Sequence, residues 1–117
     1  MEVNIMFETT NLDMLDIENG AMEIRYAVFH FQNFRKEVQE ARTYDDSDEY
    51  LKPVKRQHVE GAKNQYRYYK NSIRNAHHYL GVRNKDAVNA LIFEYKYKKE
   101  MVNALAQVPA LKLILAK

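Results

Sequence analysis

The sequence predicts an all-α protein, a small bundle of three main helices that forms a single helical domain over residues 1–117. Two observations favour helices over a sheet. The chain has only three glycines and two prolines, which leaves little of the turn chemistry that a many-stranded sheet needs. Its apolar residues recur at alternating spacings of three and four, the period of one face of a helix. With 46% hydrophobic residues, the chain is typical of a globular domain with a modest core.

A short N-terminal element precedes the first main helix. Val3, Ile5 and Phe7 alternate with polar residues, a pattern that indicates either a short strand or a frayed arm. Gly20 follows an asparagine, and this pair predicts an interruption between a short first turn and the first main helix, at about 21–43. An apolar seam runs along that helix and consists of Ala27, Phe31, Phe34, Val38 and Ala41.

The second helix follows an acidic loop at residues 44–50. Pro53 suits the first turn of a helix and Gly81 suits its C-terminal cap, so we expect the helix at about 53–80. Gly61 lies inside it and predicts a bend or a late start. A heptad seam, which favours packing against a neighbouring helix, consists of Val59, Ala62, Tyr66, Tyr69, Ile73, Ala76 and Leu80.

The third helix is expected at about 85–107, with Asn84 as its N-cap and Pro109 after its end. The C-terminal tail beyond it is rich in leucine and isoleucine, and such apolar residues need a surface to cover, either on this bundle or on another subunit. Together with the heptad seams, the tail favours a homodimer.

Several classes of protein are disfavoured by composition. The chain has no cysteine, which excludes disulfides and thiolate zinc sites. No apolar run approaches the roughly 18 residues of a membrane span. The first ten residues lack the basic start and apolar block of a signal peptide. We therefore expect a soluble, cytoplasmic protein that has no membrane partner.

Catalytic and metal-binding patterns are missing as well. Ser47 and Ser72 are the two serines, and neither lies in a glycine-flanked elbow. The three glycines are scattered, so they form no phosphate-binding loop. The acidic loop lacks the spacing of a calcium-binding EF-hand, and the four histidines match no zinc motif. We expect no enzymatic activity, no cofactor and no metal.

The two halves of the chain carry opposite charge. Residues 1–50 contain twelve acids and four bases, a net charge of −8, and residues 51–117 contain four acids and fourteen bases, a net charge of +10. Such a split favours a charged partner even though the total is only +2. Four of the acids lie in the 44–50 loop: Asp45, Asp46, Asp48 and Glu49.

The bases favour a nucleic-acid interface on the second helix. They follow spacings that place them on one flank of it, over a length of about 30 Å. The candidate residues are Arg56, Lys63, Arg67, Lys70, Arg74 and His77, extended by Lys96, Lys98 and Lys99 on the third helix. We expect Arg67, Lys70 and Arg74 to contact phosphates, and Tyr68 and Tyr79 on the outer surface to stack on bases.

The function predicted first is therefore that of a non-catalytic accessory protein that binds DNA or RNA backbone independently of sequence. The alternative is a small protein-binding inhibitor or adaptor, of the kind that phages direct against host or defence machinery. In that case the acidic loop engages a basic groove of a host protein, or the basic flank engages an acidic surface. Whether the acidic loop instead folds back over the basic flank stays open, and no motif selects a known family.

Overall fold

Three α-helices make up most of the computed structural model, which describes residues 7–45 and 47–98. They are α1 (Met14–Arg42), α2 (Lys52–Leu80) and α3 (Lys85–Lys96), with a short 3-10 turn at Val82–Asn84. No strand occurs in these two ranges, so the predicted all-α bundle of three helices is confirmed. None of the described helices is long and apolar enough to cross a membrane.

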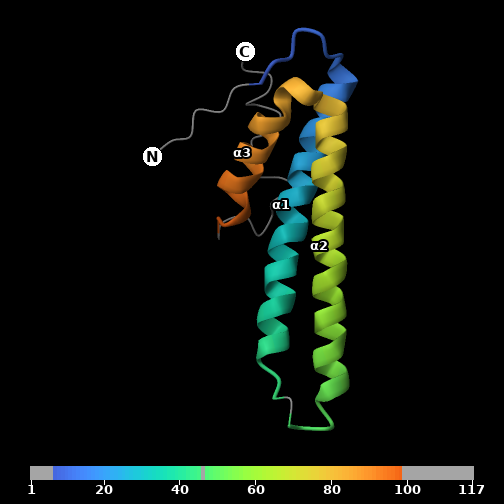
Figure 1. The fold of residues 1–117 in the computed structure, drawn as a ribbon, viewed down its shortest axis with the longest axis vertical. Helices are drawn as coiled ribbons and strands as arrows, with labels where there is room; N and C mark the ends of the chain where they lie inside the picture. Colours follow the sequence, from blue (N-terminus) through green and yellow to red (C-terminus); the bar gives the residue numbers. More distant parts are fainter. Residues whose placement is uncertain (1–6, 46, 99–117) are drawn as a thin grey trace.

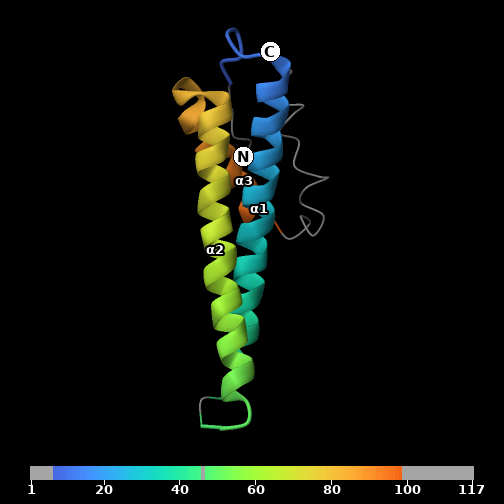
Figure 2. The same cartoon turned by 90° about the vertical axis from the view of Figure 1, so that its right-hand side faces the viewer.

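The helices α1 and α2 form a long antiparallel hairpin, and α3 folds back along only one half of it. Figures 1 and 2 show α3 beside the end of the hairpin where α1 begins, and the 44–50 loop at the opposite end. The two seams predicted from the sequence meet between α1 and α2. Their alanines, such as Ala27 and Ala76, are fully buried and let the two backbones approach closely.

A ladder of polar pairs closes the side of the hairpin away from α3. Its α1 members are seven residues apart, so each rung repeats after two helical turns. The rungs are Glu23 with Asn75 at 3.4 Å, His30 with Gln65 at 2.8 Å, and Glu37 with His58 at 2.7 Å. In each pair a polar side chain of α1 has to lie opposite its partner on α2, so the three pairs fix the register of α1 against α2.

The helix α1 is continuous, and the predicted interruption at Gly20 was wrong. Asp13 caps the helix by accepting a hydrogen bond from the backbone N–H of Asp16 at 2.8 Å. Gly20 lies in mid-helix because Leu80 of α2 packs directly on it: a Cβ there would fall within 2.9 Å of three Leu80 side-chain carbons. The glycine thus serves a close approach rather than a break. The helix α2 is likewise continuous through Gly61.

Asn84 is buried and fastens the N-terminal segment, instead of capping α3 with its side chain as predicted. Its side-chain oxygen accepts a hydrogen bond from the N–H of Glu8 at 2.6 Å, and its amide donates to the carbonyls of Glu8 and Leu80. This contact holds Phe7 in the core, where only 1% of its surface is exposed. Phe7 is therefore not part of a frayed arm; Val3 and Ile5 lie outside the described residues.

The ends of α2 and α3 complete the fold. Pro53 lies in the first turn of α2, and Gly81 ends that helix with a positive φ of 84°, as predicted. The helix α3 ends at Lys96 rather than at 107, because the chain turns there and the N–H of Lys98 donates to the carbonyl of Tyr95. Residues 99–117, which include Lys99 and the apolar tail, lie outside the described residues.

Candidate functional site

Five cations of the predicted interface lie along one edge of α2. At about 100° per residue they fall within a sector of roughly 60°, and their Cα atoms span about 27 Å along the helix axis. All five side chains are exposed. We call this set, Arg56, Lys63, Arg67, Lys70 and Arg74, the cationic edge.

The cationic edge is only weakly neutralised by the described residues around it. Lys63 lies 3.5 Å from Glu60, an exposed surface pair that contributes little. The Lys70 ammonium lies over the ring of Tyr66 at 5.3 Å from its centroid. Within the described residues, Arg67 and Arg74 form no ion pair. The edge therefore presents several positive charges to solvent in a row.

His77 of α2 and the described part of the predicted extension toward α3 make contacts within the fold. His77 shares a hydrogen bond of 2.8 Å with Asn89. Lys98 pairs with Glu94 at 3.2 Å and lies 4.6 Å from the centre of the Tyr95 ring. These contacts leave His77 and Lys98 less available to a partner than the cationic edge.

Lys96 is held still more firmly, because its ammonium lies in a cage of aromatic rings. It donates a hydrogen bond to the Tyr69 hydroxyl at 3.0 Å. The distances from its Nζ to the ring centroids run from 4.5 to 5.5 Å, and the rings are Phe31, Tyr69, Phe93 and Tyr97. Several rings around one cation attract it together. Lys96 therefore fastens the end of α3 to α1 and α2.

The two tyrosines predicted to stack on bases lie away from the cationic edge. Tyr68 and Tyr79 are about 130° and 150° around α2 from the centre of that edge. The ring of Tyr68 packs 5.3 Å from the ring of His30, on the ladder side of the hairpin. The tyrosine beside the cations is Tyr66, which is 40% exposed. Because Tyr66 belongs to the heptad seam, the sequence assigned it to the core and did not indicate that it is available to a partner.

The described part of the acidic loop does not cover the cationic edge. Hydrogen bonds from the backbone and side chain of Ser47 lower the pKa of Asp45, and Glu49 pairs with Lys52 at 2.9 Å. Asp48 accepts from the N–H of Tyr50. These partners are local, and the described part of the loop makes no contact with the cationic edge. Asp46 lies outside the described residues.

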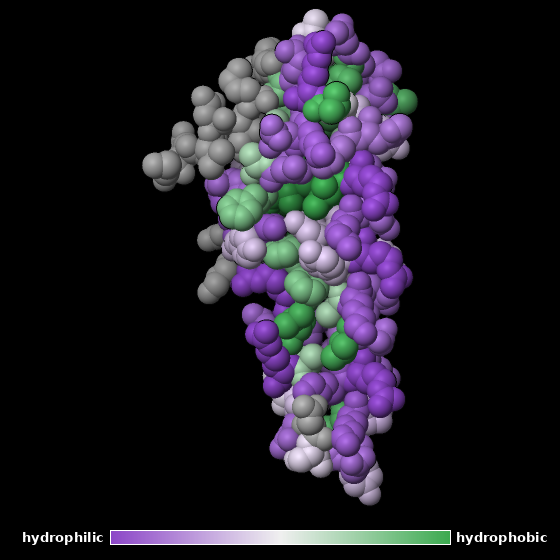
Figure 3. Space-filling view, in the orientation of Figure 1, coloured by the Kyte–Doolittle hydropathy of each residue, from purple (hydrophilic) through white to green (hydrophobic). Residues whose placement is uncertain are grey.

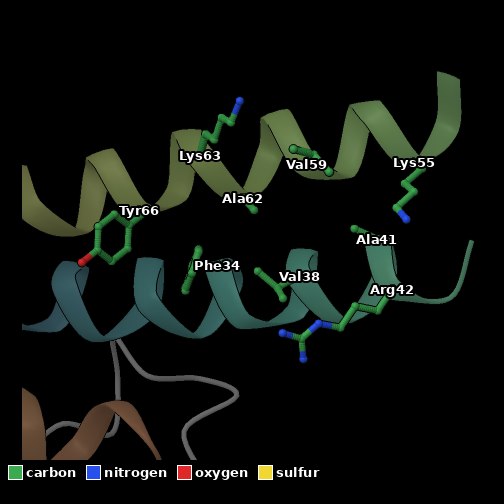
Figure 4. Close-up of a pocket in the computed structure, with 9 residues that line it drawn as sticks. All are labelled: Phe34, Val38, Ala41, Arg42, Lys55, Val59, Ala62, Lys63 and Tyr66. Atoms are coloured by element: carbon green, nitrogen blue, oxygen red, sulfur yellow. The ribbon is translucent and has the colours of Figure 1, made fainter. Parts of the chain in front are cut away.

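An apolar groove runs between α1 and α2 in the half of the hairpin that α3 leaves open. It has a volume of about 510 Å³. Figure 4 shows its apolar side chains pointing between the two helices, and Figure 3 shows hydrophobic surface flanked by hydrophilic surface on both sides. The apolar lining comes from Phe34, Val38, Ala41, Val59, Ala62 and Tyr66. Arg42, Lys55 and Lys63 form its charged rim.

Metal binding has no support in the part of the chain that the structure describes, where no cluster of three or more His, Cys, Asp or Glu side chains is placed to hold an ion. The candidate site thus consists of the cationic edge and the groove beside it. Comparisons of the chain with protein-family models, with curated proteins and with solved structures find no match.

Proposed function

We propose that the protein is a non-catalytic accessory protein that binds the backbone of nucleic acid along the cationic edge. The observation that carries this proposal is the row of five exposed cations over about 27 Å on a helix whose one acid is Glu60. One strand of a duplex presents a phosphate about every 3.4 Å along its axis, so an edge of this length runs beside about eight phosphates.

The central residues of the edge make the main contacts in this proposal. Arg67, Lys70 and Arg74 face phosphates, and Arg56 and Lys63 extend the contact toward the loop. Lysine and arginine on one helix edge carry no pattern that reads bases, so binding is independent of sequence. The ring available for stacking beside these cations is that of Tyr66 rather than Tyr68, because Tyr66 already lies under Lys70.

The test is a salt titration of binding to single- and double-stranded DNA and RNA. Five phosphate contacts give a slope of log K against log salt of roughly −4.5 for duplex DNA. Changing Arg67→Glu and Arg74→Glu together is expected to weaken binding more than about tenfold and to reduce the steepness of that slope by about two.

The matched control carries the same change of charge on other exposed surfaces, Lys36→Glu with Arg83→Glu. It is expected to weaken binding far less, because those cations lie off the edge. Circular dichroism verifies that both variants remain helical. Equal losses in the two variants, or binding that survives Arg67→Glu with Arg74→Glu, overturn the proposal.

A second candidate function is that of a protein-binding inhibitor or adaptor, and the position of the acidic loop favours it. The loop lies at the free end of the hairpin, its described acids are exposed, and their hydrogen bonds and the Glu49–Lys52 ion pair are with neighbours in the chain. Its natural partner is a basic groove of another protein. Neutralising Asp45, Asp46, Asp48 and Glu49 to their amides should then abolish partner capture, whereas under the first proposal nucleic-acid binding is unchanged or tighter.

A further inference from the structure

The apolar groove is a part of the hairpin that the described helices leave uncovered. Phe34 and Val38 belong to the α1 seam, and Val59 and Tyr66 belong to the α2 seam, yet none of the four is buried. Residues of the same seams beside α3, such as Ala76 and Leu80, are at most 1% exposed. The difference follows from the length of α3, which ends at Lys96 and does not reach the groove.

The described part of the chain ends at Lys98, close to the end of the groove that lies nearer α3. The ring of Tyr97 packs edge-on against Phe31 at 5.3 Å, and the carbonyl of Lys98 accepts a hydrogen bond from the side chain of Gln32 at 3.0 Å. The groove begins at Phe34, which is three residues, or about one helical turn, further along α1 from Phe31. Lys98, the last described residue, therefore lies about one helical turn from the groove along the axis of α1.

The sequence of that next segment matches the groove in polarity and in length. Residues 101–111 contain no charged side chain, and their larger apolar members are Met101, Val102, Leu105, Val108 and Leu111. A neutral segment suits a groove with cations such as Arg42 and Lys63 on its rims, since it meets no like charge there. The part of the segment before Pro109, residues 101–107, reaches about 10 Å as a helix, and the α1 side of the groove, 34–42, is about 12 Å long.

We propose that residues 101–111 of the same chain occupy the apolar groove between α1 and α2. The segment covers the exposed seam residues of the open half and removes their apolar surface from water. This contact within the chain goes beyond the proposed nucleic-acid function and does not depend on it. The homodimer predicted from the sequence is the competing arrangement, in which a second copy fills the groove.

The absence of cysteine makes a direct test possible, because a single introduced thiol is the only one in the chain. Val38→Cys places it on the groove floor. We expect it to react with a soluble thiol reagent at least about tenfold more slowly than the same thiol in a chain that also carries Leu105→Asp and Val108→Asp. Val82→Cys is the control, since Val82 is 83% exposed and lies outside the groove, so its rate should not depend on those two changes.

Dilution distinguishes whether the groove is covered by the chain's own segment or by a second copy of the protein. Protection that is constant from micromolar to nanomolar protein supports the proposal, and protection that disappears on dilution assigns the groove to a second copy and overturns it. A Val38→Cys thiol that reacts as fast as Val82→Cys overturns it too, and leaves the groove open for another protein.

A second measurement, disulfide cross-linking, introduces no charge into the apolar segment 101–111. Val38→Cys is combined in turn with a cysteine at 102, 105 or 108, and oxidation is expected to give an intramolecular disulfide in a monomer for at least one pair. Cross-linked dimers only, or no disulfide in any pair, contradict the proposal. The Arg67→Glu with Arg74→Glu change should leave the thiol protection unaltered, so failure of the nucleic-acid proposal is distinguishable from failure of this one.

Discussion

The half of the hairpin that α3 covers and the half that it leaves open are built from the same two seams, but they differ in burial. In the covered half, Ile24 and Val28 of α1 pack with Leu91 of α3, and all three are fully buried. In the open half, Phe34 and Val38 continue the α1 seam but remain partly exposed. A heptad seam thus predicts which way a side chain faces, whereas its burial depends on a third layer.

The two halves also differ in content: one holds most of the core, and the other holds most of the candidate binding surfaces. The covered half holds the large buried side chains and the Asn84 contact that fastens the N-terminal segment. The open half holds the groove, the acidic loop and the lower part of the cationic edge. Binding surfaces commonly occupy the less tightly packed part of a fold, because partners need apolar or charged groups that the core has not already used.

The largest effect expected from this comparison is the loss of a covered-half core residue. Leu91→Ala removes a fully buried side chain from the contact between α3 and the hairpin. It should lower the free energy of unfolding by about 2–5 kcal/mol, measured by urea denaturation. Leu15→Ala is the control in the same half: Leu15 is 64% exposed, and its loss should cost under about 0.5 kcal/mol. Similar costs for the two variants would mean that α3 is not packed as described.

A smaller effect is expected from the same substitution at two glycines. Gly20→Ala sets a methyl group against the buried Leu80 and should destabilise the protein by about 1–3 kcal/mol, although alanine is the better helix former. At Gly61 the nearest atom is a Glu37 carboxylate oxygen at 3.0 Å, which is paired with His58 and needs to shift by only a few tenths of an ångström, so Gly61→Ala should change the stability by no more than about 1 kcal/mol. Thermal unfolding of both variants compares the halves directly, and a stabilising Gly20→Ala would show that Leu80 has room to move.

The sequence predicted much of this fold and less of its surface. Periodicity placed α2 within a residue of its observed start and end, because Pro53 and Gly81 mark both ends chemically. It misplaced the start of α1, since the reason for Gly20 is a contact with Leu80, sixty residues away. No local pattern indicates such a contact.

The candidate site divides in the same way. The cationic edge follows from helical spacing alone, and the structure keeps it on one side of α2. Tyr66 was assigned to the core, because the position where α3 stops was not evident from the apolar pattern. Tyr68 was assigned to the binding surface, but it lies on the other side of α2 and packs against His30. The cage around Lys96 was hidden for a related reason: its rings come from all three helices and the residue after α3, so only the assembled fold brings them together.

Lys96 lies at the boundary between the two halves, and its replacement is expected to cost less stability than Leu91→Ala or Gly20→Ala. Lys96→Met keeps the aliphatic stem against the rings and removes the ammonium that they surround. The expected loss is about 1 kcal/mol, the range of a partly desolvated cation–π contact. Lys36→Met, an exposed cation on α1, is the control and should change the free energy of unfolding by less than about 0.5 kcal/mol.

Hydrogen exchange localises the same effect. If the cage fastens the end of α3, then Lys96→Met speeds amide exchange over the last turn of that helix, at residues 93–96, and leaves the first turns of α1 unchanged. Faster exchange throughout α3 would instead mean that the ammonium supports the whole helix. Unchanged exchange at 93–96 would show that the rings pack equally well without the charge, and the boundary between the halves would then be set by apolar contacts alone.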